Sequence, residues 1–201
     1  MIEPDVVTER LVLRSMSAGF LAATVAGRPA DGLLGLTVPD AWLDESALAR
    51  RRLADLRDDP AYAPWSLRAI GLRSTDQMVG HIGFHTRPGP SYLATIAQSG
   101  VELGYTVYPA FRRCGYAREA IVALMAWARA QQGVVRFVVS VSPENAASNA
   151  LAASLGFVRV GSHMDEIDGP EDILLLSGDA LAACLPRAAP AVDTPTARRS
   201  R

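Results

Sequence analysis

The order of apolar and polar residues predicts a mixed α/β domain, and the second half of the chain carries the clearest pattern. Apolar residues recur at helical spacing over 117–131, and Gly133 follows where a helix would end. Residues 135–141 alternate apolar side chains with mixed neighbours, which predicts a strand buried on at least one face. Asn145 then caps a short helix that Gly156 stops.

Strands and helices also alternate in the first half. The apolar pattern predicts strands over 7–14, 65–73, 78–86 and 100–108, and helices over 18–26 and 45–57. Residues 29–42 are rich in glycine and proline and are expected to form a loop. Closing strands are expected over 157–161 and 172–176. This order indicates a mixed sheet with a helical crossover in its second half.

The chain is expected to form a single domain over residues 1–185, followed by a disordered basic tail over 186–201. The tail has three prolines and four arginines against one aspartate, so it carries +3 and leaves −4 on the domain. A basic tail could contact nucleic acid or an acidic partner, but a solvated end is the simpler interpretation.

Composition excludes several classes of protein. The 20 basic and 21 acidic residues leave a net charge of −1, which argues against a protein that holds bulk nucleic acid. All basic residues are arginine, so Schiff-base lysines, pyridoxal phosphate anchoring and a Walker A loop are excluded. Cys114 and Cys184 form no C-x-x-C pair, which favours a reduced, cytoplasmic setting. Neither a signal peptide nor a membrane span is expected.

Candidate chemistry is concentrated in residues 101–118. A strand ends near Tyr108, a short loop follows, and a long helix begins. A helix N-terminus binds phosphate oxygens through its unpaired N–H groups and partial positive charge, and Gly115 lets the backbone approach the anion. The arginines add fork-shaped donors. The candidate anion-binding residues are Arg112, Arg113, Cys114, Gly115, Tyr116, Ala117 and Arg118.

The pattern Arg112-x-x-Gly115-x-Ala117 resembles the pyrophosphate loop of the GNAT superfamily, the coenzyme-A-dependent N-acetyltransferases. Four further segments are similar to the same family: T-E-R-L-V-L-R (8–14), G-H-I-G-F (80–84), N-x-x-S (145–148) and L-G-F (155–157). The resemblance covers residues 7–176. It is to the branch that contains the ribosomal-protein N-terminal alanine acetyltransferases, of RimJ and RimL type, and many acetyltransferases of small amines.

This resemblance implies a layered α/β fold, with a mostly antiparallel central sheet flanked by helices and splayed between its fourth and fifth strands. Acetyl-CoA, as co-substrate, would lie in the gap, with pantetheine along residues 102–108 and pyrophosphate on residues 112–117. In the family this strand bulges near its end. Backbone N–H groups of Thr106, Val107 and Tyr108 are therefore expected to polarise the thioester carbonyl.

The implied reaction is direct attack by an amine, of a small molecule or a protein N-terminus, on the thioester. The incoming ammonium must lose a proton, which calls for a carboxylate. Glu102 is the first candidate and Glu166 the second, while Asp165 and Asp168 could select a cationic acceptor. A structural strand carboxylate is the alternative for Glu102, and a solvated turn is the alternative for the acidic run.

The leaving thiolate needs a proton donor. Many family members use a tyrosine on the helix after the fifth strand, which this chain lacks. Ser148 is the matching hydroxyl here, with Asn145 positioning the pantetheine amides; a capping role is the alternative for Ser148. No metal is expected, because His81 and His85 lie about 13 Å apart along a strand. One of these histidines could instead line the substrate cleft.

A second class of function stays open, that of a non-catalytic acyl-CoA-binding sensor or partner module. Glu102 and Ser148 favour an enzyme, whereas the missing tyrosine favours a binding module. Residues 27–42 and 87–98 are expected to shape the acceptor pocket. Relatives are commonly dimers, and nothing in the surface pattern decides whether this chain forms a homodimer.

Overall fold

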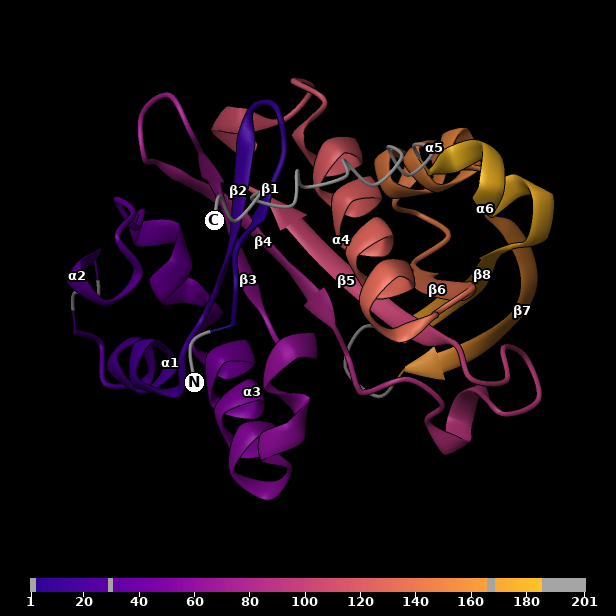
Figure 1. Cartoon of the computed structure of the whole chain (residues 1–201), viewed down its shortest axis with the longest axis horizontal. Coiled ribbons are helices and arrows are strands. Elements are labelled where there is room, and N and C mark those ends of the chain that lie inside the picture. The colour runs from indigo at the N-terminus through magenta and orange to yellow at the C-terminus, as the bar shows by residue number, and fades with distance from the viewer. Residues whose placement is uncertain (1–2, 29–30, 166–168, 186–201) are drawn as a thin grey trace, which may run out of the picture.

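The computed structural model describes residues 3–28, 31–165 and 169–185, and an eight-stranded sheet forms its centre (Figure 1). In space the strands follow the order β1-β2-β3-β4-β5-β6-β8-β7. All neighbours are antiparallel except β5 and β6. The strands are β1 (Val6–Val7), β2 (Leu11–Ser15), β3 (Arg68–Leu72), β4 (Met78–Phe84), β5 (Val101–Val107), β6 (Arg136–Val141), β7 (Val158–Asp165) and β8 (Gly169–Ser177). The mixed α/β prediction is confirmed.

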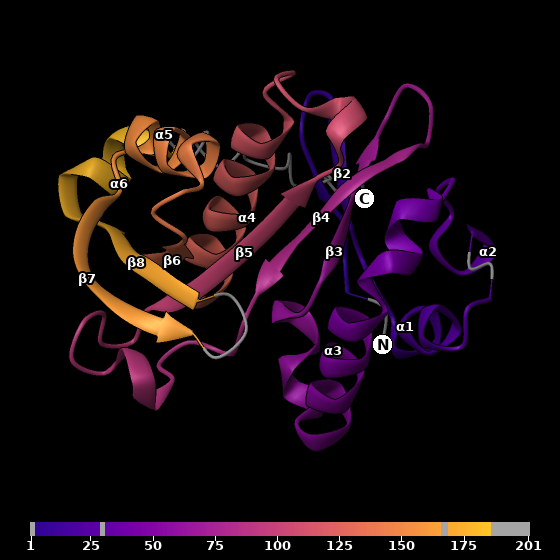
Figure 2. The ribbon, with the colours of Figure 1, turned by 180° about the vertical axis from the view of Figure 1, so that it is seen from behind.

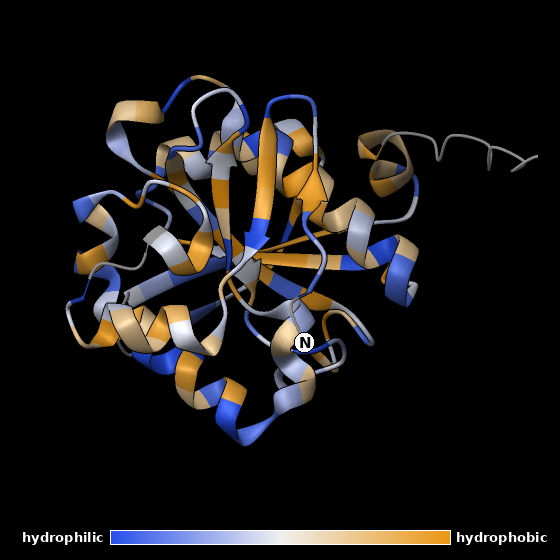
Figure 3. Ribbon diagram, turned by 60° about the vertical axis from the view of Figure 1, so that its left-hand side comes forward, coloured by the Kyte–Doolittle hydropathy of each residue, from blue (hydrophilic) through white to orange (hydrophobic). Residues whose placement is uncertain are grey.

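Helices cover both faces of this sheet. The α-helices are α1 (Ala18–Val25), α2 (Asp31–Leu34), α3 (Ser46–Asp58), α4 (Tyr116–Gln132), α5 (Ala146–Leu155) and α6 (Gly178–Cys184). Buried side chains of α4, α5 and α6 form one core with the sheet, and those of α1 and α3 form a second core. Apolar residues accordingly follow the strands through the middle of the molecule (Figure 3). None of the helices in the described ranges is long and apolar enough to cross a membrane.

The helices that bound the candidate site begin and end where the sequence predicts. Gly133 has φ +68° and its N–H donates to the carbonyl of Arg129, which ends α4. The Oδ1 atom of Asn145 accepts from the backbone N–H of Ser148 and caps α5. Gly156, at φ +92°, ends α5.

The sheet splays between β5 and β6, as the resemblance implied; these are the fourth and fifth strands of the predicted order, because the first predicted strand is divided into β1 and β2. The two strands pair only at Val101–Phe137 and Glu102–Val138. Beyond these pairs β5 stays on β4 as far as Val107, while β6 stays on β8. Figure 2 shows the two halves of the sheet diverging. The edge of β5 that faces the gap is therefore left without a neighbouring strand from Leu103 onward.

Several predicted boundaries are wrong. The single strand expected over 7–14 is a hairpin of β1 and β2, because Thr8 turns the chain by accepting from the N–H of Leu11. The expected loop over 29–42 contains α2 and the start of a 3-10 helix, Asp40–Glu45. Trp65 ends another 3-10 helix rather than starting β3. The pattern did not predict α6, and the proposed tail over 186–201 lies outside the described residues.

Candidate active site

A cavity of about 700 Å³ lies where β5, the loop before α4 and the start of α5 meet. This volume suits a small-molecule site. Of the twelve residues predicted to bind the cofactor, all but Tyr108 and Cys114 line it. Tyr108 is buried in the core around α1 and α3, and Cys114 is exposed. The predicted residues in the lining are Thr106, Val107, Arg112, Arg113, Gly115, Tyr116, Ala117, Arg118, Asn145 and Ser148.

The loop before α4 has the backbone geometry of an anion cradle. Arg113 and Gly115 both have left-handed backbone conformations, at φ +61° and +79°. Such residues turn successive N–H groups toward one side and form a concavity that binds anions. The first N–H groups of α4 add to it, because they have no partner inside the helix. The loop therefore fits a pyrophosphate group.

Three residues that the motif does not contain hold this loop in place. Glu119 on α4 accepts from the hydroxyl of Thr8 at 2.6 Å and from Nε of Arg10 at 2.7 Å. Arg10 also donates to the carbonyl of Cys114 at 2.9 Å. Burial raises the pKa of Glu119, but these hydrogen bonds outweigh it and the net shift is downward. The opening segment, which resembles the family but had no predicted role, thus anchors the loop.

The register of β4 and β5 decides which backbone donors reach the cavity. Thr106 pairs with His81, and the N–H of Tyr108 donates to the carbonyl of Val79 at 2.9 Å. Backbone groups of alternate residues point to opposite edges of a strand, so those of Tyr105 and Val107 face the gap. The N–H groups of Thr106 and Tyr108 are used within the sheet, contrary to the prediction, whereas that of Val107 faces the gap.

The bulge expected near the end of β5 is also absent from this pair. The register of β4 and β5 runs without a shift from Phe84–Leu103 to Gly80–Val107. The irregularity lies instead between β3 and β4, at Ile70 and Gly71. At this irregularity β4 has one residue more than β3. The pairing of β5 with β4 stays regular.

Two hydroxyl groups that line the cavity lie close to each other. Ser148 lines it from α5 and Tyr105 lines it from β5. Burial raises the pKa of Tyr105, and a hydrogen bond with Ser148 opposes that shift. The resemblance predicts a proton-donating tyrosine on the helix, now α5, and gives no role to Tyr105 on β5. Tyr105 lies on the predicted strand over 100–108, two residues before Val107, and this spacing was the signal that could have identified it.

Glu102 lies on the opposite face of β5 from α4 and is almost completely buried. Its Oε1 accepts from the hydroxyl of Ser140 at 2.5 Å, and its Oε2 lies 3.6 Å from Nδ1 of His85. Burial alone raises the pKa of this carboxyl. The interactions with His85, and then with Ser140 and Tyr92, outweigh burial and hold the pKa at about 2.

This depressed pKa predicts a specific loss of stability in acid. The pKa of Glu102 falls from 4.5 to about 2 on folding, so its contribution is present above pH 4.5 and is lost as the pH falls toward 2. At roughly 1.4 kcal/mol per unit this amounts to about 3 kcal/mol. Urea unfolding at pH 5 and pH 2 should show an acid destabilisation that is smaller by about this amount in Glu102→Gln than in the wild-type protein. Equal destabilisation of the two proteins would contradict the assigned environment.

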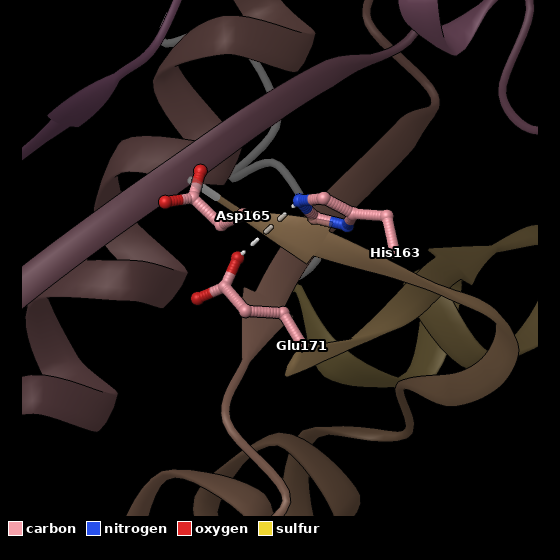
Figure 4. Close-up of side chains that lie close together, drawn as sticks. All are labelled: His163, Asp165 and Glu171. Atoms are coloured by element: carbon pink, nitrogen blue, oxygen red, sulfur yellow. Dashed lines mark ion pairs between the residues drawn. The ribbon is translucent and has the colours of Figure 1, made fainter. Parts of the chain in front are cut away.

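Asp165 is the one remaining predicted acidic residue that the structure describes. Glu166 and Asp168 are outside the described residues, while Asp165 ends β7. Asp165 lies with His163 and Glu171 in a group whose ligand atoms are within 4.8 Å of one another (Figure 4). Such a group could hold a metal ion; His163 is exposed, while Asp165 and Glu171 are half-buried. His81 and His85 do not point to one position at which both could bind a metal ion, because His81 faces Glu45 and His85 faces Glu102.

Comparison with known proteins agrees with this geometry. The family model described as an acetyltransferase (GNAT) domain matches residues 10–158. The uncharacterized N-acetyltransferase YoaA of Bacillus subtilis is 26% identical over 163 residues, which cover 79% of this chain and 85% of YoaA.

Two solved structures have the same fold. The ribosomal-protein-S5-alanine acetyltransferase of Vibrio fischeri has a TM-score of 0.61 and 14% identity, covering 88% of this chain and 98% of its own. Mycobacterium smegmatis RimJ, in complex with CoA-disulfide, has a TM-score of 0.57 and 20% identity, covering 90% and 88%. The family match spans most of the chain, which therefore belongs to the GNAT acetyltransferases, enzymes that transfer an acetyl group from acetyl-CoA.

Proposed function

We propose that the protein acetylates a primary amine, with acetyl-CoA bound in the cavity between the open edge of β5 and the loop before α4. The observation that carries this proposal is the continuity of that cavity, which joins free strand-edge groups to an anion cradle. Pyrophosphate would lie on residues 112–118 and pantetheine along Tyr105 and Val107. In this position one acetyl-CoA molecule would bind to the strand-edge groups of β5 and to the anion cradle at the same time.

Bound acetyl-CoA supplies the thioester, whose C–S bond breaks as the acceptor nitrogen bonds to the acetyl carbon. The N–H of Val107 would stabilise negative charge on the carbonyl oxygen. Ser148, beside Tyr105, would protonate the departing sulfur. Asn145 orients the start of α5 through its cap, and its amide nitrogen remains for a pantetheine oxygen. Glu102 supplies negative charge on the other face of β5, where the acceptor would enter.

The acceptor is either a small amine or a protein N-terminus. One structural neighbour is named as an acetyltransferase of an alanine in ribosomal protein S5, which favours including peptides among the candidates. The negative charge of Glu102 favours a cationic group. We place the reaction in the cytoplasm, since Cys114 and Cys184 are free thiols.

Release of free thiol from acetyl-CoA tests the function directly. The panel contains polyamines, aminoglycosides, amino acids and peptides with free N-termini. We expect one acceptor class to release thiol and to yield the acetylated amine by mass spectrometry. Tight binding of acetyl-CoA without turnover of any class would overturn the proposal in favour of a binding module.

A further inference from the structure

The buried position of Glu102 separates it from the acceptor. Its side chain is only 8% exposed, and its two oxygens face Ser140 and His85 respectively. A carboxylate enclosed in this way cannot approach an incoming amine without breaking those contacts. Its low pKa also makes it a weak proton acceptor at neutral pH.

His85 lies between this carboxylate and solvent. It directly follows β4, and its backbone N–H donates to the carbonyl of Glu102 at 2.9 Å. Its side chain is 41% exposed, with Nδ1 turned toward Glu102. Nε2 lies over β5, so close to Gly104 that a Cβ atom there would be 2.7 Å away. The absence of a side chain at Gly104 therefore lets the imidazole reach the strand along which we place the pantetheine.

We propose that His85 is the catalytic residue that removes the proton from the acceptor ammonium, and that Glu102 is a positioning residue behind it. This proposal rests on the proposed function. An Nε2–H bond forms as an N–H bond of the ammonium breaks, and the nitrogen keeps the electron pair that attacks the acetyl carbon. The C–S electrons leave with sulfur, which takes a proton from Ser148. The newly bonded nitrogen, now cationic, releases its second proton to solvent, solvent returns a proton to Ser148, and His85 later returns its own proton to solvent.

A carboxylate beside Nδ1 of a histidine can prepare the imidazole to act as a base. A carboxylate that accepts from Nδ1–H holds the imidazole in the tautomer whose Nε2 is free to take a proton. Imidazole accepts protons near neutral pH, where a general base is most effective. The present 3.6 Å separation of Nδ1 and Oε2 is longer than a hydrogen bond, and such contacts shorten when substrate binds.

The groups packed around His85 hold its backbone rather than compete for its ring. Arg52 on α3 donates to the carbonyl of His85 at 3.0 Å and pairs with Asp55 at 2.8 Å. The hydroxyl of Tyr62 donates to the carbonyl of Phe84. Tyr92 faces Glu102; burial and then that negative charge raise the pKa of its hydroxyl. Glu102 is the carboxylate that faces the imidazole.

Kinetics of His85→Gln test the catalytic role. We expect kcat to fall by roughly 100- to 10,000-fold, with the acidic limb of the pH profile lost and the Kd of acetyl-CoA unchanged. His163→Gln is the matched control, because His163 is similarly exposed and lies 3.6 Å from Glu171. It should keep the wild-type kcat. A His85→Gln enzyme with wild-type kcat and pH profile would overturn the proposal.

A second measurement needs no acceptor. Nitrogen NMR of the wild-type protein, assigned by comparison with His85→Gln, should place the proton of the neutral imidazole on Nδ1. A proton on Nε2 would overturn the proposal, because that nitrogen could not then accept another. If wild type turns over no acceptor in the panel, the proposed function fails while this spectrum still decides the arrangement of His85 and Glu102.

Discussion

Replacing Gly115 with alanine is expected to weaken acetyl-CoA binding by roughly 10- to 100-fold. Gly115 has φ +79°, a conformation that strains any residue with a Cβ atom. Relief of that strain would turn the loop's N–H groups away from the pyrophosphate. Hydrogen bonds to a charged group contribute about 1.5–3 kcal/mol, which sets the size of the effect. Isothermal titration with acetyl-CoA measures it.

Gly133→Ala is the matched control for this effect. Gly133 has φ +68° at the other end of α4, a Cβ atom there would have no neighbour within 4 Å, and the residue does not line the cavity. Each substitution should reduce the free energy of unfolding by about 1–2 kcal/mol. Only Gly115→Ala should change the Kd. An equal change in both variants would mean that loss of stability, rather than the anion cradle, explains the result.

Glu102→Gln is expected to lower kcat by about 100-fold or more while leaving the Kd of acetyl-CoA unchanged. The substitution keeps the size of the side chain but removes the negative charge beside His85 and Ser140. A positioned proton acceptor contributes roughly 100- to 10,000-fold to a rate, and its supporting carboxylate shares in that effect. Steady-state kinetics with the acceptor found in the panel measure the change.

Asp5→Asn controls for the loss of any paired carboxylate. Asp5 pairs with Arg14 at 3.0 Å, away from β5 and the cavity. We expect wild-type kcat in this variant. If Glu102→Gln also kept wild-type kcat, the carboxylate would be purely structural, which is the alternative that the sequence left open.

Local features of the site could be predicted from sequence because neighbouring residues determine them. The spacing of apolar residues and the flanking glycines predicted α4 and α5 almost to the residue. The anion loop is one contiguous segment, so its motif identifies most of the cavity lining. The splay between β5 and β6 came from the family resemblance, since no local pattern encodes where two strands separate.

Contacts between distant segments could not be predicted in the same way. Glu102 meets Ser140 and His85 only because β5, β6 and the end of β4 are aligned in one register. A shift of one residue would turn each of these side chains to the other face. The anchoring of Glu119 by Thr8 and Arg10 likewise joins positions more than a hundred residues apart.

The choice of backbone donors shows the same limit. Sequence placed Thr106, Val107 and Tyr108 correctly near the end of a strand, but alternate residues of a strand bond to opposite neighbours. Only the register with β4 reveals that Thr106 and Tyr108 are used within the sheet. The backbone groups that face the gap are therefore those of Tyr105 and Val107.

A crystal structure of the complex with acetyl-CoA tests the central claim most directly. We predict pyrophosphate oxygens within hydrogen-bonding distance of the N–H groups of residues 113–117, and pantetheine along Tyr105 and Val107. The acetyl group should point through the gap toward the face that carries His85 and Glu102. Acetyl-CoA bound outside the cavity, or with its pyrophosphate away from the loop, would contradict the proposed site.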